Sequence, residues 1–585
     1  MKQFFKFAFA SCLGFGISVI VLGYLLIFGI TGLVASMGSS KKSLDNNSVL
    51  HLKLSGSVVD RAQDSPINTM FSDYNTSQTG LDQVLKAIDN AKKSPKVEGI
   101  FLEPGMIQAG LPTIAEIRRK LEDFKSSGKF VYAYSDYYGQ AGYYLATVAD
   151  SIFVNPVGAV DIKGLSANLM FFKGTLDKLG VDMQIFKVGT FKSAVEPFIE
   201  TKMSDANRQQ VTDYVNSMWG SVSEEISAAR KISVKSLQEV ANEGIFAKEA
   251  ELLVSNNLVD KLYYREDVEQ MLRNNLGITK RDDLKLAKIA DVAAEVIDSK
   301  SKKSSDAIAL VYAVGEIDGT SKDKVDTKKL AAEIYKIKAD SSVKAVVLRV
   351  NSPGGSAFGS EQVWKALDDL KKDKPFVVSM GDLAASGGYY IACGADWIFA
   401  EPTTLTGSIG IFGMIPNTKA LTDKLGLSFD QVETNRFASM PSIHKAMNED
   451  EKRLIQSNVE RGYELFTRRC AEGRNMPIDN LLAIAEGRVW TGKSALELSL
   501  VDELGGMDAA ISKAASLAAL TDYKVDEYPA KKDFMQTLLE DFGGSAVQTI
   551  GSIVIGDNYK YYSLLNSIKS MESVQARLPY ILTIE

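Results

Sequence analysis

The sequence is poor in the residues that build most metal sites and most serine-protease triads. Of 585 residues only two are histidine, His51 and His444. His51 alternates with leucines in a strand-like run, and His444 lies in a polar stretch before a predicted helix. Two histidines are too few for a His-rich metal site, and no His-Glu-x-x-His motif is present. We therefore expect no metal, no cofactor and no Ser-His-Asp triad.

Cysteine is equally scarce, with Cys12, Cys393 and Cys470 only. Cys12 lies in an apolar N-terminal run, so at most one disulfide could form in the rest of the chain. The fold therefore does not depend on a disulfide framework. Cys393 falls in a pattern typical of a buried helix, which indicates packing rather than nucleophilic chemistry.

No excess of positive charge is present either. The net charge is −6, with 24% charged and 45% hydrophobic residues. This composition is typical of a folded protein and gives no electrostatic footprint for nucleic acid. The length allows two to four domains at roughly 150 residues each.

The N-terminus lacks charge over a long stretch. No charged residue occurs from Phe7 to Ser40, and the apolar run from Phe7 to Val34 exceeds the ~20 residues that span a bilayer. We predict a membrane anchor within residues 1–45. A cleaved signal peptide is the alternative, although Val34-Ala35-Ser36 matches a cleavage site poorly. The number of lysines is nearly equal on the two sides of the apolar run, so charge alone does not set its orientation. The short leader before the run favours an amino terminus that stays inside the cell.

The rest of the chain is an internal duplication. Val131-Tyr-Ala-Tyr-Ser-Asp136 matches Val377-Val-Ser-Met-Gly-Asp382 at an offset of 246 residues, and the register continues without gaps through Asp177–Gly180 and Asp423–Gly426. Repeats of this length indicate two copies of one structural unit. We predict an N-terminal copy at 46–300 and a C-terminal copy at 301–585.

Each copy reads as alternating strands and helices. In the second copy, strands are predicted at 308–314, 345–350 and 375–379, with helices at 328–337 and 361–370. Both copies end in a strongly helical stretch, at 205–229 and 449–472. Strands that alternate with helices predict an α/β fold of stacked βα units.

The two copies differ at a loop after the third strand. The second copy reads Gly381-Asp-Leu-Ala-Ala-Ser386-Gly387-Gly388, and its serine is matched by Gln140 in the first copy. Ser386 falls where a strand turns into a helix, a position that exposes a hydroxyl beside free backbone N–H groups. An ordinary N-cap serine is the alternative. The loop is not a Gly-x-Ser-x-Gly elbow, because Ala384 replaces the first glycine.

At a second position the reactive group is in the first copy instead of the second. Lys192 of the first copy is matched by Ala438 of the second, so each copy carries one of two complementary groups. A serine hydroxyl needs a base, and a lysine can serve when burial keeps its amine neutral. An ordinary surface lysine is the alternative reading. Lys187 is a rival, but its counterpart Glu433 favours a surface role. We predict that Ser386 and Lys192 form one composite site.

Glycine-rich turns near the serine can bind a developing oxyanion. The Gly387 N–H follows the nucleophile, and the turn Asn351-Ser-Pro-Gly354-Gly355 can supply a second N–H from Gly354. A plain turn is the alternative. The run Gly407–Gly413 has no phosphate-loop spacing and predicts close backbone packing beside the site.

Four segments together resemble the long, duplicated form of the bacterial signal peptide peptidase A family, also called protease IV. They are Arg349–Gly355, Gly381–Gly388, Thr404–Gly413 and Lys192–Pro197. The resemblance implies two Clp protease/crotonase-like ββα superhelix units after one transmembrane helix. It also implies a Ser-Lys dyad of Ser386 and Lys192, with Ser408 orienting the lysine.

The same resemblance implies where and on what the protein acts. It implies cleavage of remnant signal peptides and other extended, apolar peptides by an acyl-enzyme mechanism. It further implies a homotetrameric ring in the bacterial inner membrane, single-pass, with the catalytic part on the periplasmic side. Two other classes stay open: a crotonase-like acyl-CoA enzyme and a catalytically silent scaffold that binds membrane proteins.

Overall fold

The computed structural model describes residues 44–62, 78–295, 304–319, 324–531, 574–577 and 583–584, with isolated positions 14, 18 and 21. None of the helices in these stretches is both long and apolar enough to cross a bilayer. The predicted anchor, Phe7 to Val34, lies outside the described residues except for those isolated positions.

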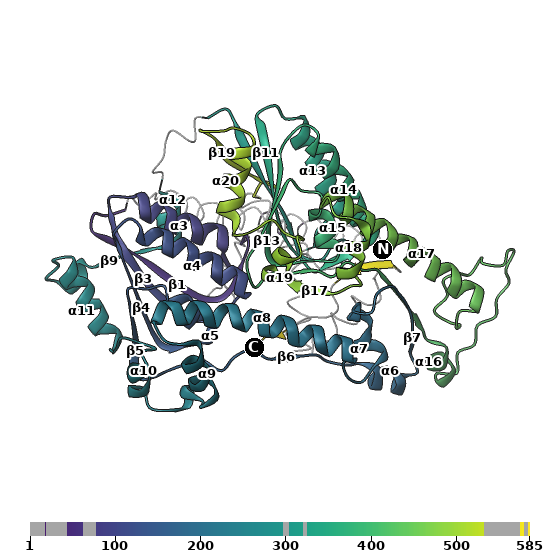
Figure 1. Ribbon diagram of the computed structural model, residues 1–585, viewed down its shortest axis with the longest axis horizontal. Helices are drawn as coiled ribbons and strands as arrows, with labels where there is room; N and C mark the ends of the chain where they lie inside the picture. Colours follow the sequence, from purple (N-terminus) through teal and green to yellow (C-terminus); the bar gives the residue numbers. More distant parts are fainter. Residues whose placement is uncertain are drawn as a thin grey trace, which may run out of the picture.

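The first copy contains a parallel sheet with the strand order β2-β1-β3-β4-β5-β8, and β9 pairs with β1. Helices α3 and α4 pack beside this sheet (Figure 1). The strands are β1 (Ser48–Val59), β2 (Thr79–Gly80), β3 (Val97–Gln108), β4 (Phe130–Tyr138), β5 (Ser151–Val160), β8 (Lys261–Leu262) and β9 (Lys285–Lys288). The helices are α3 (Leu81–Lys93), α4 (Leu111–Lys125), α5 (Gln140–Ala146), α6 (Lys173–Leu179), η1 (Ser193–Val195), α7 (Glu196–Ile199), α8 (Asp205–Arg230), α9 (Val234–Asn242), η2 (Ile245–Ala247), α10 (Glu251–Ser255), α11 (Arg265–Asn275), η3 (Arg281–Asp283) and α12 (Ile289–Ala294).

The second copy repeats this plan with the order β17-β15-β13-β11-β10-β19, and β14 pairs with β13 and β18. All pairs are parallel except β15 with β17. The strands are β10 (Ala307–Val314), β11 (Val343–Ser352), β13 (Phe376–Ala385), β14 (Trp397–Ala400), β15 (Leu405–Gly407), β17 (Val489–Thr491), β18 (Glu503–Leu504) and β19 (Lys524–Tyr528). The helices are α13 (Thr327–Ala339), α14 (Ala357–Lys371), α15 (Gly387–Ala392), α16 (Lys419–Lys424), α17 (Glu449–Gly473), α18 (Ile478–Ile484), α19 (Gly492–Glu497) and α20 (Met507–Leu517).

The α/β prediction is confirmed element by element. The three strands predicted for the second copy are β10, β11 and β13, and the two helices are α13 and α14. The long helices predicted at the end of each copy are α8 and α17. Strand β11 is buried along most of its length, and its central residues are mainly apolar, as expected for a central parallel strand covered on both faces.

Two smaller sheets connect segments that are far apart in the sequence. One has the order β12-β20-β16-β7, with β12 (Gly354–Ser356), β20 (Val574–Arg577), β16 (Phe412–Asn417) and β7 (Asp182–Lys187). The other pairs β21 (Thr583–Ile584) with β6 (Ala167–Asn168). Strand β7 belongs to the first copy and β16 to the second, so the two copies interlock there.

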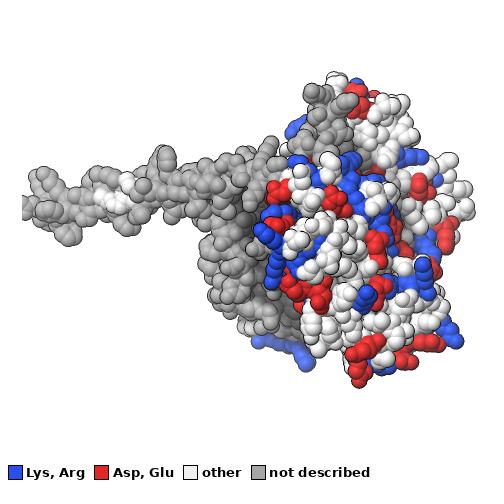
Figure 2. All heavy atoms as spheres, turned by 90° about the vertical axis from the view of Figure 1, so that its left-hand side faces the viewer, with Lys and Arg blue, Asp and Glu red and all other residues white. Residues whose placement is uncertain are grey.

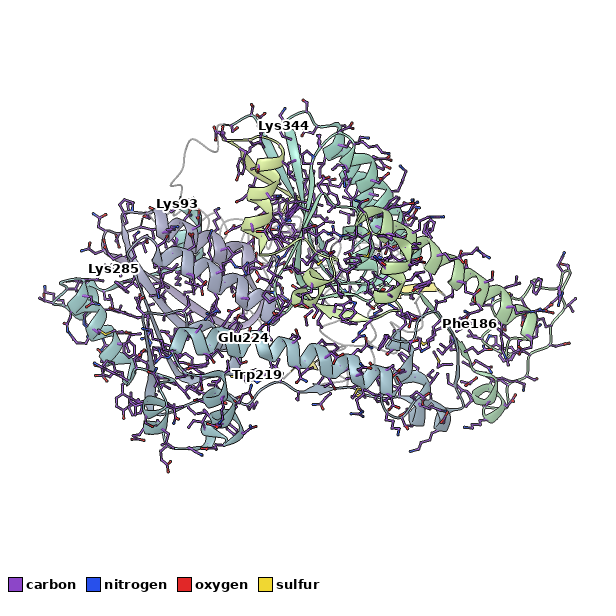
Figure 3. The ribbon with its side chains drawn as sticks, in the orientation of Figure 1. Lys93, Phe186, Trp219, Glu224, Lys285 and Lys344 are labelled. Atoms are coloured by element: carbon purple, nitrogen blue, oxygen red, sulfur yellow. The ribbon has the colours of Figure 1, made fainter. Side chains whose placement is uncertain are left out.

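The figures show how far this interlocking extends. Helix α8 of the first copy runs along the lower side of both copies (Figure 1). Phe186, on β7, lies at the opposite end of the molecule from Lys93 and Lys285 of the same copy (Figure 3). The first copy therefore extends an arm, the segment that contains β7, across the second copy.

Buried charges join the copies at their shared face. Arg349 of β11 is almost fully buried, and its guanidinium donates to Asp60 at 2.7 Å and to Glu116 at 2.8 Å, both in the first copy. Arg119 of α4 donates to the buried Glu401 at 2.9 and 2.6 Å. Buried ion pairs are stable only when geometry and hydrogen bonding are well matched. These hydrogen bonds tie the two copies together at this face.

The surface shows mixed charge. On the face presented in Figure 2, Lys and Arg side chains alternate with Asp and Glu, and neither sign forms a continuous patch. This face offers no positive stripe of the kind that binds a nucleic-acid backbone.

Candidate active site

Ser386 occupies the turn between β13 and α15. Its backbone has φ 54° and ψ −113°, and its N–H donates to the Gly407 carbonyl at 2.8 Å. A non-glycine residue with positive φ is uncommon and strained. The side chain makes no capping hydrogen bond to α15, so the N-cap alternative for this serine is wrong. The hydroxyl is held free of the helix and available for other contacts.

Lys192 reaches the same point from the arm of the first copy. It lies just before η1 and is fully buried. Its backbone and side chain pack against two glycines of the second copy. An ideal Cβ on Gly487 would lie 2.6 Å from Lys192 Cβ, and one on Gly410 would lie 3.2 Å from Lys192 Cδ. Larger residues at these positions would displace the lysine.

The two side chains meet. Lys192 Nζ lies 2.8 Å from Ser386 Oγ, and both residues are fully buried. Nζ also lies 3.1 Å from Ser408 Oγ and 3.1 Å from the Ser408 carbonyl oxygen. A neutral amine has two N–H donors and one lone pair. It can therefore donate to both Ser408 oxygens and still accept a hydrogen bond from the Ser386 hydroxyl.

Burial sets the charge state of the amine. It holds the pKa of Lys192 well below the ordinary value of 10.5. Desolvation disfavours the ammonium form, and the described neighbours of Nζ are hydroxyl and carbonyl oxygens rather than a carboxylate. The predicted alternative of a surface lysine is wrong, because the side chain has no exposure.

Ser408 is placed by the turn that follows β15. It also has a positive φ, 49°, and its N–H donates to the Arg488 carbonyl at 2.7 Å. The turn is part of the glycine-rich run Gly407–Gly413, in which Gly410 packs against Lys192. The prediction of close backbone packing beside the site is confirmed.

The two glycines expected to bind an oxyanion lie side by side. Gly354 has φ 96°, and an ideal Cβ on it would lie 2.7 Å from the Gly387 nitrogen. The Gly354 N–H donates to Ser352 Oγ at 3.2 Å. Both glycines follow the carboxyl ends of neighbouring parallel strands, β11 and β13, where open α/β sheets place their sites.

Several contacts that support the site gave no recognisable signal in the sequence. Gln210 of α8 donates to the Phe191 carbonyl at 3.1 Å and to Ser193 Oγ at 3.1 Å. Glu196 accepts hydrogen bonds from the Ser204 N–H and from Asn207. These contacts fix the backbone on both sides of Lys192. Their partners are separated by up to 19 residues, so no local pattern reveals them.

The strand that leads into Ser386, β13, is held by the first copy. Asp382 of β13 accepts from the Thr113 N–H at 3.0 Å and from its hydroxyl at 2.9 Å. Burial raises the pKa of this carboxyl. The residues equivalent to the dyad in the other copy have different roles. Gln140, equivalent to Ser386, hydrogen-bonds to the backbone of Gly164, and Ala438, equivalent to Lys192, lies in an exposed turn.

Together these features define a class: a duplicated α/β protein with a buried hydroxyl–amine pair and an adjacent glycine turn at the junction of its copies. The model of peptidase family S49 matches residues 123–279 and 368–521, one match in each copy. The chain therefore belongs to peptidase family S49 and is a protease. The duplication is that of the long form expected from the sequence.

Two relatives found by sequence agree with this assignment. A protein named Protease 4 from Salmonella typhi is 35% identical over 533 residues, 89% of this chain and 82% of its own. A putative signal peptide peptidase SppA from Enterococcus faecium is 36% identical over 215 residues, 37% of this chain and 62% of its own. A solved structure of a ClpP1 mutant from Listeria monocytogenes aligns with 34% of this chain and 94% of its own, at 15% identity and a TM-score of 0.24.

Proposed function

We propose that this protein is a serine endopeptidase that uses Ser386 as nucleophile and Lys192 as general base. The single observation that carries the proposal is the 2.8 Å separation of Lys192 Nζ and Ser386 Oγ in a fully buried setting. At this distance the proton can pass directly from hydroxyl to amine. Ser408 is the residue that orients the amine.

The chemistry follows from this geometry. Ser386 Oγ attacks the scissile carbonyl carbon while its proton moves to Lys192 Nζ. The carbonyl oxygen becomes an oxyanion beside Gly387 and Gly354, where each N–H donor is worth roughly 3–4 kcal/mol. The ammonium returns the proton to the leaving amine, which leaves an acyl-enzyme. Water, deprotonated by the neutral amine, then releases the acid and restores Ser386.

The substrate class in this proposal is extended, apolar peptide, including remnant signal peptides. The motif resemblance supports it, as does the name of the Enterococcus faecium relative, a putative signal peptide peptidase. Likeness to those motifs also underlies the proposed Clp protease/crotonase-like superhelix of each copy. No cofactor is required for this chemistry.

A fluorophosphonate probe tests the nucleophile directly. It should label wild-type protein at Ser386, located by peptide mass spectrometry, because only an activated serine attacks it rapidly. A crotonase-like acyl-CoA enzyme or a silent scaffold would not react and would not hydrolyse casein. Labelling at another serine, with casein hydrolysis intact, would refute the assignment.

The pH dependence should follow the lysine. Because the base is the neutral amine, kcat/KM should rise with pH through the pKa of Lys192 and then level off. Burial lowers that pKa, so the plateau should begin well below pH 10.5. A profile measured with a non-titrating peptide substrate checks this. A rise centred near the ordinary lysine pKa would contradict a buried neutral base.

We also propose a ring-shaped homo-oligomer, a tetramer, tethered to the bacterial inner membrane by residues 1–45 with its catalytic part on the periplasmic side. Strand pairing between the copies supports the ring. Within one chain, β7 of the first copy pairs with β16 of the second. At the offset of 246, the counterparts of these strands are 428–433 and 166–171.

Those counterparts do not form the same pair within the chain. Met183 and Phe186 of β7 are buried, but the equivalent Phe429 and Val432 are 54% and 97% exposed. Among described residues, β6 at 167–168 pairs only with β21. Two half-interfaces that do not pair with each other within the described chain favour head-to-tail contact with the next chain, a heterologous contact of the kind that generates rings.

A further inference from the structure

The two central strands that end beside the candidate nucleophile are separated by a bulge. Val350 of β11 lies opposite Met380 of β13. The next pair in the register is Ser352 with Ala384, so three residues of β13 face a single residue of β11, Asn351. A bulge of this kind interrupts the backbone ladder and changes the direction of the strand, and bulges are common next to active sites.

The Asn351 side chain closes this bulge. Its Oδ1 accepts a hydrogen bond from the Leu383 N–H at 3.1 Å, and an ideal Cβ on Gly381 would lie 3.0 Å from its Cγ, so a larger residue there would crowd the amide. Asn351 precedes Gly354 by three residues, and Leu383 precedes Gly387 by four. The amide therefore links the two strands just before each reaches its glycine of the proposed oxyanion site.

The first copy binds the other end of this amide. Asp60 follows β1 directly and is only 3% exposed. Its Oδ2 accepts from Asn351 Nδ2 at 2.5 Å, and its Oδ1 accepts from Arg349 Nε at 2.7 Å. Because a carboxylate is an acceptor only, it requires Asn351 to present its NH2 group to Asp60 and its oxygen to the Leu383 N–H. We call this chain of contacts, from Asp60 through Asn351 to Leu383, the amide relay.

The amide relay belongs to the copy that carries the nucleophile. At the offset of 246 residues, Asn351 corresponds to Gly105 and Arg349 to Glu103. Glycine has no side chain to close a bulge, and Glu103 is bound to His51 at 2.8 Å instead. The equivalent turn of the first copy therefore lacks the relay, and the loop beside it lacks the serine.

We propose that Asp60 and Asn351 are positioning residues for the oxyanion site. Asp60 of the first copy orients the Asn351 amide, and the amide holds the two glycines at the separation that binds a developing oxyanion. Neither side chain touches the reacting atoms. The proposal rests on the proposed chemistry of Ser386 and Lys192, and it gives the first copy a second part in catalysis besides supplying the base.

Asp60→Asn tests the relay with almost no change in shape. The substituted amide presents an NH2 group to the NH2 group of Asn351, and if Asn351 turns over, its NH2 group faces the Leu383 N–H instead. We expect kcat to fall about 10²-fold, the effect of losing one oxyanion donor. KM should change less than about twofold, because the donors bind the transition state more tightly than the substrate. Hydrolysis of a fluorogenic peptide by full-length protein in detergent measures both constants.

An exchange of the two groups should restore the relay. In the double variant Asp60→Asn/Asn351→Asp, the carboxylate at position 351 accepts from both the amide at position 60 and the Leu383 N–H. Its kcat should return to within about fivefold of wild type, since the exchange isolates the coupling between the two positions. Asn351→Asp alone sets two carboxylates against each other and should be at least as impaired as Asp60→Asn.

Two measurements separate positioning from a general loss of structure. A peptide boronate forms a tetrahedral adduct with Ser386 and should bind the Asp60→Asn variant about 10²-fold more weakly than wild type, because the adduct needs the oxyanion donors. The midpoint of the pH profile should stay at its wild-type value, because the substitution leaves the contacts of Lys192 in place. A merely loosened fold would shift that midpoint and weaken substrate and boronate alike.

Glu116→Gln is the matched control. Glu116 binds the same guanidinium as Asp60, at 2.8 Å, but its second oxygen accepts from the Met507 N–H rather than from the relay. This variant should keep kcat within about twofold of wild type. If Asp60→Asn does not fold, the exchange variant decides the outcome, because the relay requires it to fold and to act.

Three results would each overturn the relay: wild-type kcat in Asp60→Asn, an equal loss of kcat in Glu116→Gln, or an exchange variant that stays impaired or unfolded. In each case hydrolysis that depends on Ser386 would leave the proposed function standing. An active Ser386→Ala variant would instead refute the proposed function.

Discussion

Ser386→Ala and Lys192→Ala should each lower kcat/KM by at least about 10⁴-fold, and the double variant should be no worse than either single one. The two groups act as a unit, so removing one already removes the activated nucleophile. Peptide hydrolysis measured at the plateau pH checks this. Lys192→Arg should be equally inactive, because arginine is not deprotonated at working pH.

Controls separate lost chemistry from lost structure. Lys187→Ala removes the rival lysine, which lies on β7 of the same arm, and should retain most of the activity. Each dyad variant should unfold cooperatively, near the wild-type temperature or above it, since a buried amine contributes little favourable energy. Half-normal activity in Lys192→Ala would rule out this lysine as the base.

Phe429→Asp combined with Val432→Asp should convert the assembly to single chains. Each substitution removes an apolar side chain whose burial is worth roughly 1.5–3 kcal/mol and places a charge in the proposed interface. Wild-type protein in detergent should have four times the 63.8 kDa mass of the chain by native mass spectrometry. The double variant should be found at the mass of one chain.

Val157→Asp is the matched control for the assembly. Val157 is also highly exposed, at 88%, but it lies on β5, outside both proposed half-interfaces. This variant should keep the wild-type mass. A wild-type protein that is a fully active monomer would refute the ring, although it would leave the dyad within one chain intact.

The two copies differ in a complementary way at the candidate site. Ser386 is aligned with Gln140, and Lys192 is aligned with Ala438. Complementary differences of this kind are visible without coordinates because the copies share one register. Strand and helix patterns were equally readable, since apolar periodicity depends only on near neighbours in the chain.

Supporting contacts could not be predicted in the same way. Gly487 packs on Lys192 from 295 positions away in the chain, and Thr113 binds Asp382 across 269 residues. Neither contact follows a local period or a shared motif. Such partners are selected by how the two sheets dock, and the docking depends on buried groups such as Arg349.

By itself, the sequence determined the α/β class, the duplication, the family and the two chemically complementary residues, because each is recorded in residue type and spacing. Only the tertiary structure decided that Lys192 is fully buried and 2.8 Å from Ser386, and that β20 lies between β12 and β16. Burial and strand pairing are properties of segments brought together from distant parts of the chain. A lysine has a lowered pKa, and a short strand has a partner, only after those segments have met.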